Sequence, residues 1–300
     1  MMHAPVIIFA YNRSRQLQET LNALGKNDLA DQTDVYIFSD GPKNEEDSIK
    51  VRQTRKVIEE YQIKNNFRST TVQMFEKNRG LARSVISGVT EVIQKHQKVI
   101  VLEDDLITST DFLSYMNSGL DYYMQEEKVG AISGFSPIRV NNKKCPEGIY
   151  RSRTGNSCGW ATWLRVWEKV DWNVNDYLEF RSDPEMVRKF NSIQYGISDI
   201  LDKQMAGCID SWAVRWDFSF FKNRLWTIYP VTSKIQNVGF GKESSTSRNR
   251  FDKRRKIRAE QMDYRMTEME KLLDMTAETS KYFKAGLVEK VLDKIQKIKK

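Results

Sequence analysis

The stretch Lys98-Val-Ile-Val-Leu-Glu-Asp-Asp105 decides how the rest of the sequence is interpreted. Residues 98–102 are an almost continuous apolar run, which is typical of a strand that is buried on both faces of a sheet. Three acidic residues, Glu103, Asp104 and Asp105, follow directly. Neighbouring carboxylates repel one another, so this triplet is costly unless a cation accompanies it. The alternative is a solvated acidic turn without a ligand.

Three further strand-and-helix units precede this strand. Strands are expected at 5–10, 34–38 and 70–75, and helices around 45–61 and 81–94. A further helix is expected after the turn at 11–13, with Leu17, Leu21 and Leu24 on one face. Such alternation implies parallel strands joined by crossover helices. The carboxyl ends of these strands border a ligand crevice, which places the acidic triplet beside a binding site. An oxygen-liganded cation, Mn²⁺ or Mg²⁺, would relieve the repulsion there and hold a diphosphate.

The second half of the sequence is less regular and is rich in tryptophan. Helices are expected at 160–170, 192–205 and 212–222, strands at 226–229 and 234–238, and two helices within 258–300. The predicted fold class is therefore α/β, with a mixed, mainly parallel sheet flanked by helices and a C-terminal helical extension.

Composition and charge narrow the class of protein. Hydrophobic residues make up 40% of the 300 residues and charged residues 29%, which predicts a packed core. No apolar run approaches the roughly 20 residues of a membrane-spanning helix, and no signal-peptide pattern opens the sequence, so a cytoplasmic protein is expected. The net charge of +8 is concentrated in 248–258 and the last twenty residues. Since no recognition motif accompanies these basic residues, a nucleic-acid partner is not expected.

The order of several short motifs resembles that of GT-A glycosyltransferases, in particular N-acetylglucosaminyltransferase I and related family 2-like bacterial sugar transferases. Residues 99–106 resemble their metal-binding strand, and residues 5–13 resemble their first strand and nucleotide-binding turn. Further similar segments are 39–41, 78–82, 159–168, 210–212 and 239–251. The resemblance implies a GT-A fold, which is Rossmann-like, and a metal-dependent transfer of sugar from a nucleotide diphosphate donor to an acceptor hydroxyl.

The resemblance implies that residues 1–106 form the half that binds the nucleotide sugar. Asp105 would bind the metal, Asp104 would contact the ribose, and Glu103 would contact the donor sugar. The nucleotide and its phosphates would be lined by Tyr11, Asn12, Arg13, Asp40, Asn78, Gly80 and Arg83. The carboxylate of Asp40 is suited to accept a hydrogen bond from the N3–H of uracil, so a UDP-sugar is the favoured donor.

The resemblance also implies that residues 107–251 are the acceptor-binding and catalytic half of the same domain. Asp210 would be the general base of an inverting transfer, and Trp212 and Trp216 would bury it and raise its pKa. The alternative role of Asp210 is a helix N-cap. Ser211 stands where the mammalian relative has a second aspartate, so Asp217 is kept as a reserve candidate for the base.

Two further features of this half concern the acceptor and the donor lid. Among the clustered tryptophans, Trp160 is the one most expected to be exposed to a sugar, although their helical spacing also suits a core. The loop 239–251, with Gly239, Gly241 and Lys242, would order over bound donor, or would be a plain flexible connection. It lacks the histidine that many bacterial relatives carry there.

Residues 252–300 are expected to be a basic helical extension. An apolar stripe among lysines suits peripheral contact with an anionic inner membrane leaflet, or packing on the core or a second subunit. The implied acceptor is a saccharide or lipid-linked saccharide in bacterial surface polysaccharide or glycoconjugate synthesis. A different functional class is a non-catalytic carbohydrate- or nucleotide-binding protein on a GT-A scaffold, which nucleotide release would distinguish from an enzyme.

Overall fold

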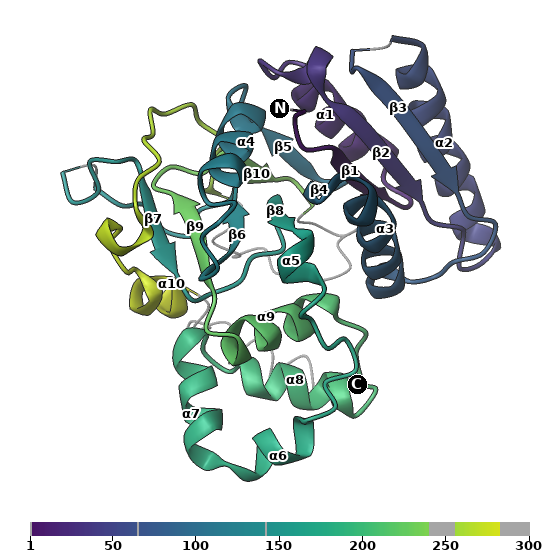
Figure 1. The fold of residues 1–300 in the computed structure, drawn as a ribbon. Helices are drawn as coiled ribbons and strands as arrows, with labels where there is room; N and C mark the ends of the chain where they lie inside the picture. Colours follow the sequence, from purple (N-terminus) through teal and green to yellow (C-terminus); the bar gives the residue numbers. More distant parts are fainter. Residues whose placement is uncertain (1, 65, 142, 240–255, 283–300) are drawn as a thin grey trace.

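The computed structural model describes residues 2–64, 66–141, 143–239 and 256–282, and its centre is a sheet of eight strands. The strands lie in the order β3-β2-β1-β4-β8-β6-β9-β7, and β7 and β8 run antiparallel to the others. The sheet is therefore mixed and mainly parallel, as predicted. Figure 1 shows helices packed around it and a separate group of helices below it.

The first half consists of the predicted strand-and-helix units. They are β1 (Val6–Ala10), α1 (Ser14–Leu24), β2 (Asp34–Ser39), α2 (Glu45–Lys64), β3 (Ser69–Met74), α3 (Leu81–His96) and β4 (Lys98–Glu103). β1 pairs in parallel with both β2 and β4, so all five of its residues are buried. The carboxyl ends of β1, β2 and β4 consequently meet at one edge of the sheet.

The second half adds short strands and a helix to the same core. They are β5 (Leu106–Thr108), α4 (Phe112–Tyr122), β6 (Val129–Ser133), β7 (Ile149–Ser152), β8 (Trp160–Trp163), β9 (Trp226–Pro230) and β10 (Ile235–Asn237). β5 and β10 form a small antiparallel sheet of their own. The predicted strands at 226–229 and 234–238 are thus confirmed.

The prediction of a helix at 160–170 is wrong for its first four residues. Residues 160–163 form β8, which inserts antiparallel between β4 and β6, and only the short α5 (Leu164–Trp167) follows. The four residues of β8 are all buried because the strand lies inside the sheet. Aromatic and β-branched residues favour strands, and this signal in Trp-Ala-Thr-Trp was outweighed by the spacing of the tryptophans.

The part of the chain between β8 and β9 forms a separate helical lobe. It consists of α6 (Tyr177–Ser182), α7 (Pro184–Ile193), α8 (Ile197–Met205) and α9 (Trp212–Lys222), which is the predicted helix at 212–222. The lobe has its own small core, formed by Val174, Phe180, Phe190, Ile197, Leu201, Val214 and Phe218. The single helix expected near 192–205 is instead two, because Gly196 adopts a left-handed conformation, φ +72°, between them.

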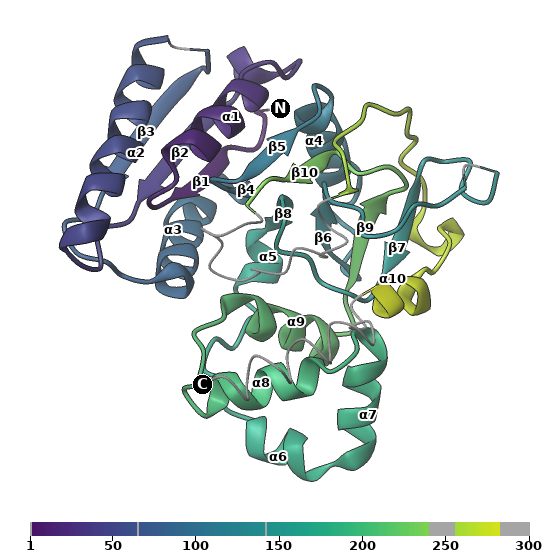
Figure 2. The same cartoon turned by 180° about the vertical axis from the view of Figure 1, so that it is seen from behind.

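The C-terminal segment does not form the helix expected from residue 258. Residues 257–268 contain neither helix nor strand and run over the far end of the sheet before α10 (Thr276–Tyr282), as Figure 2 shows in yellow. Tertiary contacts decide this path: Lys234 Nζ donates to the Met262 carbonyl at 2.9 Å, and Tyr123 Oη donates to the Thr267 carbonyl at 2.6 Å. The apolar stripe proposed for membrane contact lies in 283–300, outside the described residues. None of the described helices combines the length and apolar character needed to cross a membrane.

Candidate active site

The turns after β1 and β4 bring together residues that are about ninety positions apart in the sequence. The Tyr11 backbone N–H donates to Asp104 Oδ2 at 3.1 Å, and Arg13 Nη1 donates to Asp105 Oδ2 at 2.6 Å. Both aspartates are buried. The structure therefore joins the predicted nucleotide-binding turn to the predicted metal-binding acids.

Crowding of the acids makes this edge of the sheet favourable for a cation. Burial, followed by repulsion from Asp105, raises the pKa of Glu103 to about 8 and that of Asp104 to about 7. Carboxylate oxygens suit Mn²⁺ or Mg²⁺. In the part of the chain that the structure describes, no three acidic, histidine or cysteine side chains form a metal-binding group. The residues fit a cation that takes one ligand from Asp105 and the others from a donor diphosphate and water.

Gly239 packs directly against Asp105. A Cβ atom added to Gly239 would lie 1.7 Å from Asp105 Oδ2, and the neighbouring Val238 N–H donates to the Asp105 carbonyl at 2.9 Å. The end of β10 thus fixes the backbone and the carboxylate of the metal-ligand candidate. Gly241 and Lys242, the other lid residues predicted from the sequence, lie outside the described residues.

Asp40 organises the turn at 78–80. Its Oδ1 accepts from the Gly41 and Arg79 backbone N–H groups, and its Oδ2 accepts from Asn78 Nδ2 and the Gly80 N–H, at 2.8–3.1 Å. A carboxylate offers about four lone-pair sites, and these four donors occupy them. This arrangement argues against the predicted bond from Asp40 to a uracil N3–H.

Asp47 is a site residue that the sequence analysis missed. Its carboxylate accepts from Tyr11 Oη at 2.6 Å and from Asn12 Nδ2 at 3.0 Å, so it fixes both side chains of the predicted nucleotide-binding turn. The hydrogen bond from Tyr11 is the main cause of the lowered pKa of Asp47. Asp47 lies in the first turn of α2, where an acidic residue is expected for any helix. Its position in the sequence therefore carried no functional signal.

The predicted phosphate-binding residues lie around the N-terminus of α3. Gly80 precedes the helix with φ +79°, a conformation that favours glycine, and Arg83 is exposed in the first turn. The unpaired N–H groups of a helix N-terminus suit a phosphate.

Asp210 faces this turn from the helical lobe. Its Oδ2 lies 3.6 Å from the position that a Cβ atom on Gly80 would take, and its Oδ1 accepts from Arg215 Nη2 at 3.2 Å. The side chain is 63% exposed, so the expected burial by Trp212 and Trp216 is wrong. The N-cap alternative is also wrong, because Ser211 caps α9 by accepting from the Val214 N–H.

Burial acts instead on Asp217, the reserve candidate for the base. Burial raises the pKa of Asp217 from 3.8 to about 7, and an interaction with the Gly155 backbone partly opposes this rise.

The tryptophans form core rather than an open platform: Trp160 is 1% exposed and stacks on Trp212 with ring centroids 5.3 Å apart. The prediction that Trp160 contacts an acceptor is therefore wrong.

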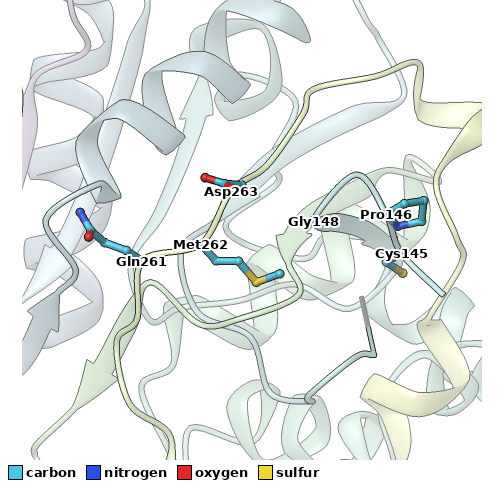
Figure 3. Close-up of a pocket in the computed structure, with 6 residues that line it drawn as sticks. All are labelled: Cys145, Pro146, Gly148, Gln261, Met262 and Asp263. Carbon is cyan, nitrogen blue, oxygen red and sulfur yellow. The ribbon is translucent and has the colours of Figure 1, made fainter. Parts of the chain in front are cut away.

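A cavity of about 460 Å³ lies at the β7 end of the sheet, between the turn at 145–148 and the C-terminal segment (Figure 3). Its lining residues are Cys145, Pro146, Gly148, Gln261, Met262 and Asp263. β7 is four strand positions from β4, which corresponds to roughly 19 Å at the usual spacing of about 4.8 Å. Reacting atoms must approach to about 3–3.5 Å, so this cavity does not belong to a transfer site at Asp105.

Comparisons with known proteins complete the description. None of the curated proteins matches the sequence significantly. Three similar solved structures are S. aureus TarS (19% identity, 44% of this chain and 21% of that chain, TM-score 0.34), a Pyrobaculum calidifontis mannosyltransferase in complex with GDP-Man and Mn²⁺ (15%, 56% and 46%, 0.41), and mouse xyloside xylosyltransferase 1 (9%, 74% and 82%, 0.37). The match thus spans about a fifth of TarS and less than half of the mannosyltransferase.

The match to a protein family is more extensive. Residues 1–199, which include β1 to β8 and the acidic triplet, match the model of the GNT-I family. The sheet has the mixed, mainly parallel order expected of a GT-A enzyme. The chain therefore belongs to the GNT-I family of GT-A glycosyltransferases.

Proposed function

We propose that this glycosyltransferase is metal-dependent and inverting, and that it moves a sugar from a nucleotide diphosphate donor, with UDP favoured, to an acceptor hydroxyl. The observation that carries the proposal is the convergence of Arg13, Asp105 and Asp210 on one edge of the sheet. Arg13 donates to Asp105, and Asp210 lies beside Gly80, whose N–H donates to Asp40 at the end of β2. This arrangement supports a donor that lies between an acidic, cation-binding wall and a general base.

The residues of the chain supply the remaining steps. A bound cation would stabilise negative charge on the departing diphosphate. Arg13 and the N-terminus of α3 would hold the phosphates. Asp210 would accept the proton of the acceptor hydroxyl while that oxygen attacks the anomeric carbon from the face opposite the leaving group. The exposed carboxylate of Asp210 is accessible to such an acceptor.

The preference for UDP rests on family membership, since Asp40 already accepts four hydrogen bonds from the chain itself. A saccharide or lipid-linked saccharide of a bacterial surface polysaccharide or glycoconjugate is the proposed acceptor class. Residues 1–106 are proposed as the donor half and 107–251 as the acceptor half.

The test is a screen of UDP-, GDP- and dTDP-sugars with Mn²⁺ or Mg²⁺, in which released nucleotide diphosphate is measured with and without EDTA. We expect release with at least one donor, strongest for a UDP-sugar, and its loss in excess EDTA. Equal release in EDTA contradicts metal dependence. Tight donor binding without release, with and without saccharide acceptors, supports the alternative of a non-catalytic binding protein.

A further inference from the structure

A second cavity, of about 170 Å³, lies between the helical lobe and the loop that precedes β8. The residues that line it come from that loop, from α8 and α9 with the residues just before them, and from the segment after β6: Phe135, Gly155, Asn156, Ser157, Cys158, Gln194, Ile197, Ile200, Ser211, Ala213, Val214, Trp216 and Asp217. β8 is adjacent to β4 and β6 is next in order, so the strands that border this cavity lie roughly 5–10 Å from β4, whose last residue is two positions before Asp105. Unlike the cavity at β7, it lies beside the two strands that follow β4 in the sheet.

The lining of the cavity contains one buried polar group that the described part of the fold does not use. Trp216 is 1% exposed, and its Nε1 donor has no hydrogen-bond partner among the residues that the structure describes. Its Cδ1 atom, which is bonded to Nε1, lies 3.5 Å from the Cβ position of Gly155, so the polar edge of the ring faces the lining loop. A buried N–H without a partner destabilises the fold, and a ligand oxygen at this position would supply the missing hydrogen bond.

Asp217 lies one residue further along α9, beside the same loop. A Cβ atom on Gly155 would lie 1.8 Å from Asp217 Oδ1, so this glycine allows the carboxylate to approach the loop. Among the described residues that line the cavity, Asp217 is the charged one. A carboxylate and an indole N–H beside Phe135 offer an acceptor, a donor and apolar surface, the combination that binds the hydroxyls and the ring face of a sugar.

We propose that this cavity is the acceptor subsite and binds one uncharged sugar ring, with Asp217 accepting hydrogen bonds from its hydroxyls and Trp216 Nε1 donating to one of its oxygens. The acceptor role rests on the proposed function. The volume is below the roughly 300–1,000 Å³ of pockets for drug-sized ligands, so a single ring fits better than an oligosaccharide. A uronic acid would bring a second negative charge next to Asp217, which disfavours it.

This assignment makes Asp217 a specificity-determining residue and leaves proton transfer to Asp210. The two carboxylates have different surroundings: Asp210 is exposed and faces Gly80, whereas Asp217 faces the cavity and Gly155. Loss of Asp217 should therefore weaken acceptor binding, and loss of Asp210 should slow transfer.

The test is saturation-transfer NMR on the full chain with methyl glycosides of glucose, galactose and mannose, and with methyl glucuronide as the charged comparison. We expect at least one neutral glycoside to bind, and Asp217→Asn to weaken that binding about ten- to hundredfold, as expected for a hydrogen bond to a charged group. Ala213→Leu, which fills the cavity from α9, should weaken it as well. Asp199→Asn removes an exposed carboxylate of the neighbouring α8 and should leave binding unchanged.

Several results would overturn the proposal: no binding of any neutral glycoside, equal binding by wild type and Asp217→Asn, or tightest binding of the glucuronide. Displacement of the glycoside by UDP and Mn²⁺ would assign the signal to the donor site instead. The NMR readout needs no turnover, so it separates failure of this proposal from failure of the proposed function. In transfer assays, a rise in the acceptor KM supports the assignment, whereas a fall in kcat alone contradicts it.

Discussion

The edge of the sheet proposed to bind the donor and the side of the molecule proposed to bind the acceptor differ in how their polar groups are used. At the donor edge, Asp40 accepts four hydrogen bonds from nearby N–H groups, Asp47 accepts two, and Asp105 is paired with Arg13. On the proposed acceptor side, Trp216 Nε1 has no partner within the described part of the chain, and Asp217 is held where burial disfavours its charge. The polar groups of the proposed donor edge are held in place by hydrogen bonds before any ligand binds. On the proposed acceptor side, polar groups are left to make hydrogen bonds with a ligand.

This difference is consistent with the ligand that each side would recognise in the proposed reaction. A nucleotide diphosphate is highly charged. Its site needs dipoles and charges that folding has already oriented, so that they need not reorganise when the ligand binds. A neutral sugar is recognised by a few hydrogen bonds and an apolar face, so its cavity needs hydrogen-bond donors and acceptors that have no partner before the sugar binds. Four predictions test this contrast.

The largest effect is expected at the donor edge. Asp105→Ala should reduce transfer at least about 10²–10³-fold, the scale seen when one preorganised electrostatic group is removed from an active site. Metal-dependent release of nucleotide diphosphate is the measurement, and Asp199→Ala, an exposed position on α8, is the matched control. Because Asp105 is buried and paired with Arg13, thermal unfolding must show that the variant folds. Near-normal turnover by a folded Asp105→Ala protein would show that the metal is held elsewhere or is not needed.

Asp210→Asn should reduce kcat by about 10²–10⁴, because the amide keeps the size of the side chain but cannot accept a proton. Donor affinity, measured by calorimetry with the nucleotide diphosphate and Mn²⁺, should change little. Asp217→Asn is the paired variant, and its main effect should be on the acceptor KM. If instead Asp217→Asn abolishes kcat and Asp210→Asn is nearly normal, the roles of the two carboxylates are reversed.

The charge of Asp217 should also make stability depend on pH. Its pKa is raised from 3.8 to about 7 in the folded protein, so its destabilising effect grows as pH rises from about 4 to 7 and is complete above 7. Asp217→Asn lacks this effect. Allowing for partial exposure of the side chain, its stability relative to wild type should increase by about 1–2 kcal/mol between pH 5 and pH 8, measured by urea unfolding. A difference that stays constant, as expected for the control Asp199→Asn, would mean that the carboxylate is well solvated.

The smallest effect concerns the helix cap between the two carboxylates. Ser211→Ala should lower the free energy of unfolding by about 0.5–1 kcal/mol, because Ser211 accepts a 3.4 Å hydrogen bond from the Val214 N–H at the start of α9. Asp210→Asn should cost less stability than this, since Asp210 does not cap the helix. The opposite order in thermal unfolding would restore the capping role to Asp210.

Much of the donor half was predictable from the sequence because its signals are local. The apolar runs of β1, β2 and β4 and the amphipathic faces of α1 and α3 correspond to the observed elements within a few residues. Each of these strands is followed at once by its polar turn, so the parallel topology alone brings Tyr11, Asp40 and Asp105 to one edge. Asp47 was missed because an acidic residue in a first helical turn needs no functional explanation.

The acceptor half was harder to predict because long-range packing decides its structure. The local sequence around Trp160 is compatible with either a helix or a strand. Only insertion between β4 and β6 makes it part of a buried strand. The path of residues 257–268 is likewise set by partners such as Lys234 and Tyr123, which lie far away in the sequence.

The sequence by itself determined the fold class, the family and the position of the acidic triplet, since hydrophobic periodicity and strand-end motifs are properties of short segments. Only the tertiary structure decided which aspartate is exposed, which is buried and which is already hydrogen-bonded. Asp40, Asp210 and Asp217 carry the same carboxylate, and their sequence neighbours do not distinguish them. Burial and hydrogen bonding depend on groups supplied by other elements, such as the 78–80 turn for Asp40 and Gly155 for Asp217, and these meet only when the chain folds.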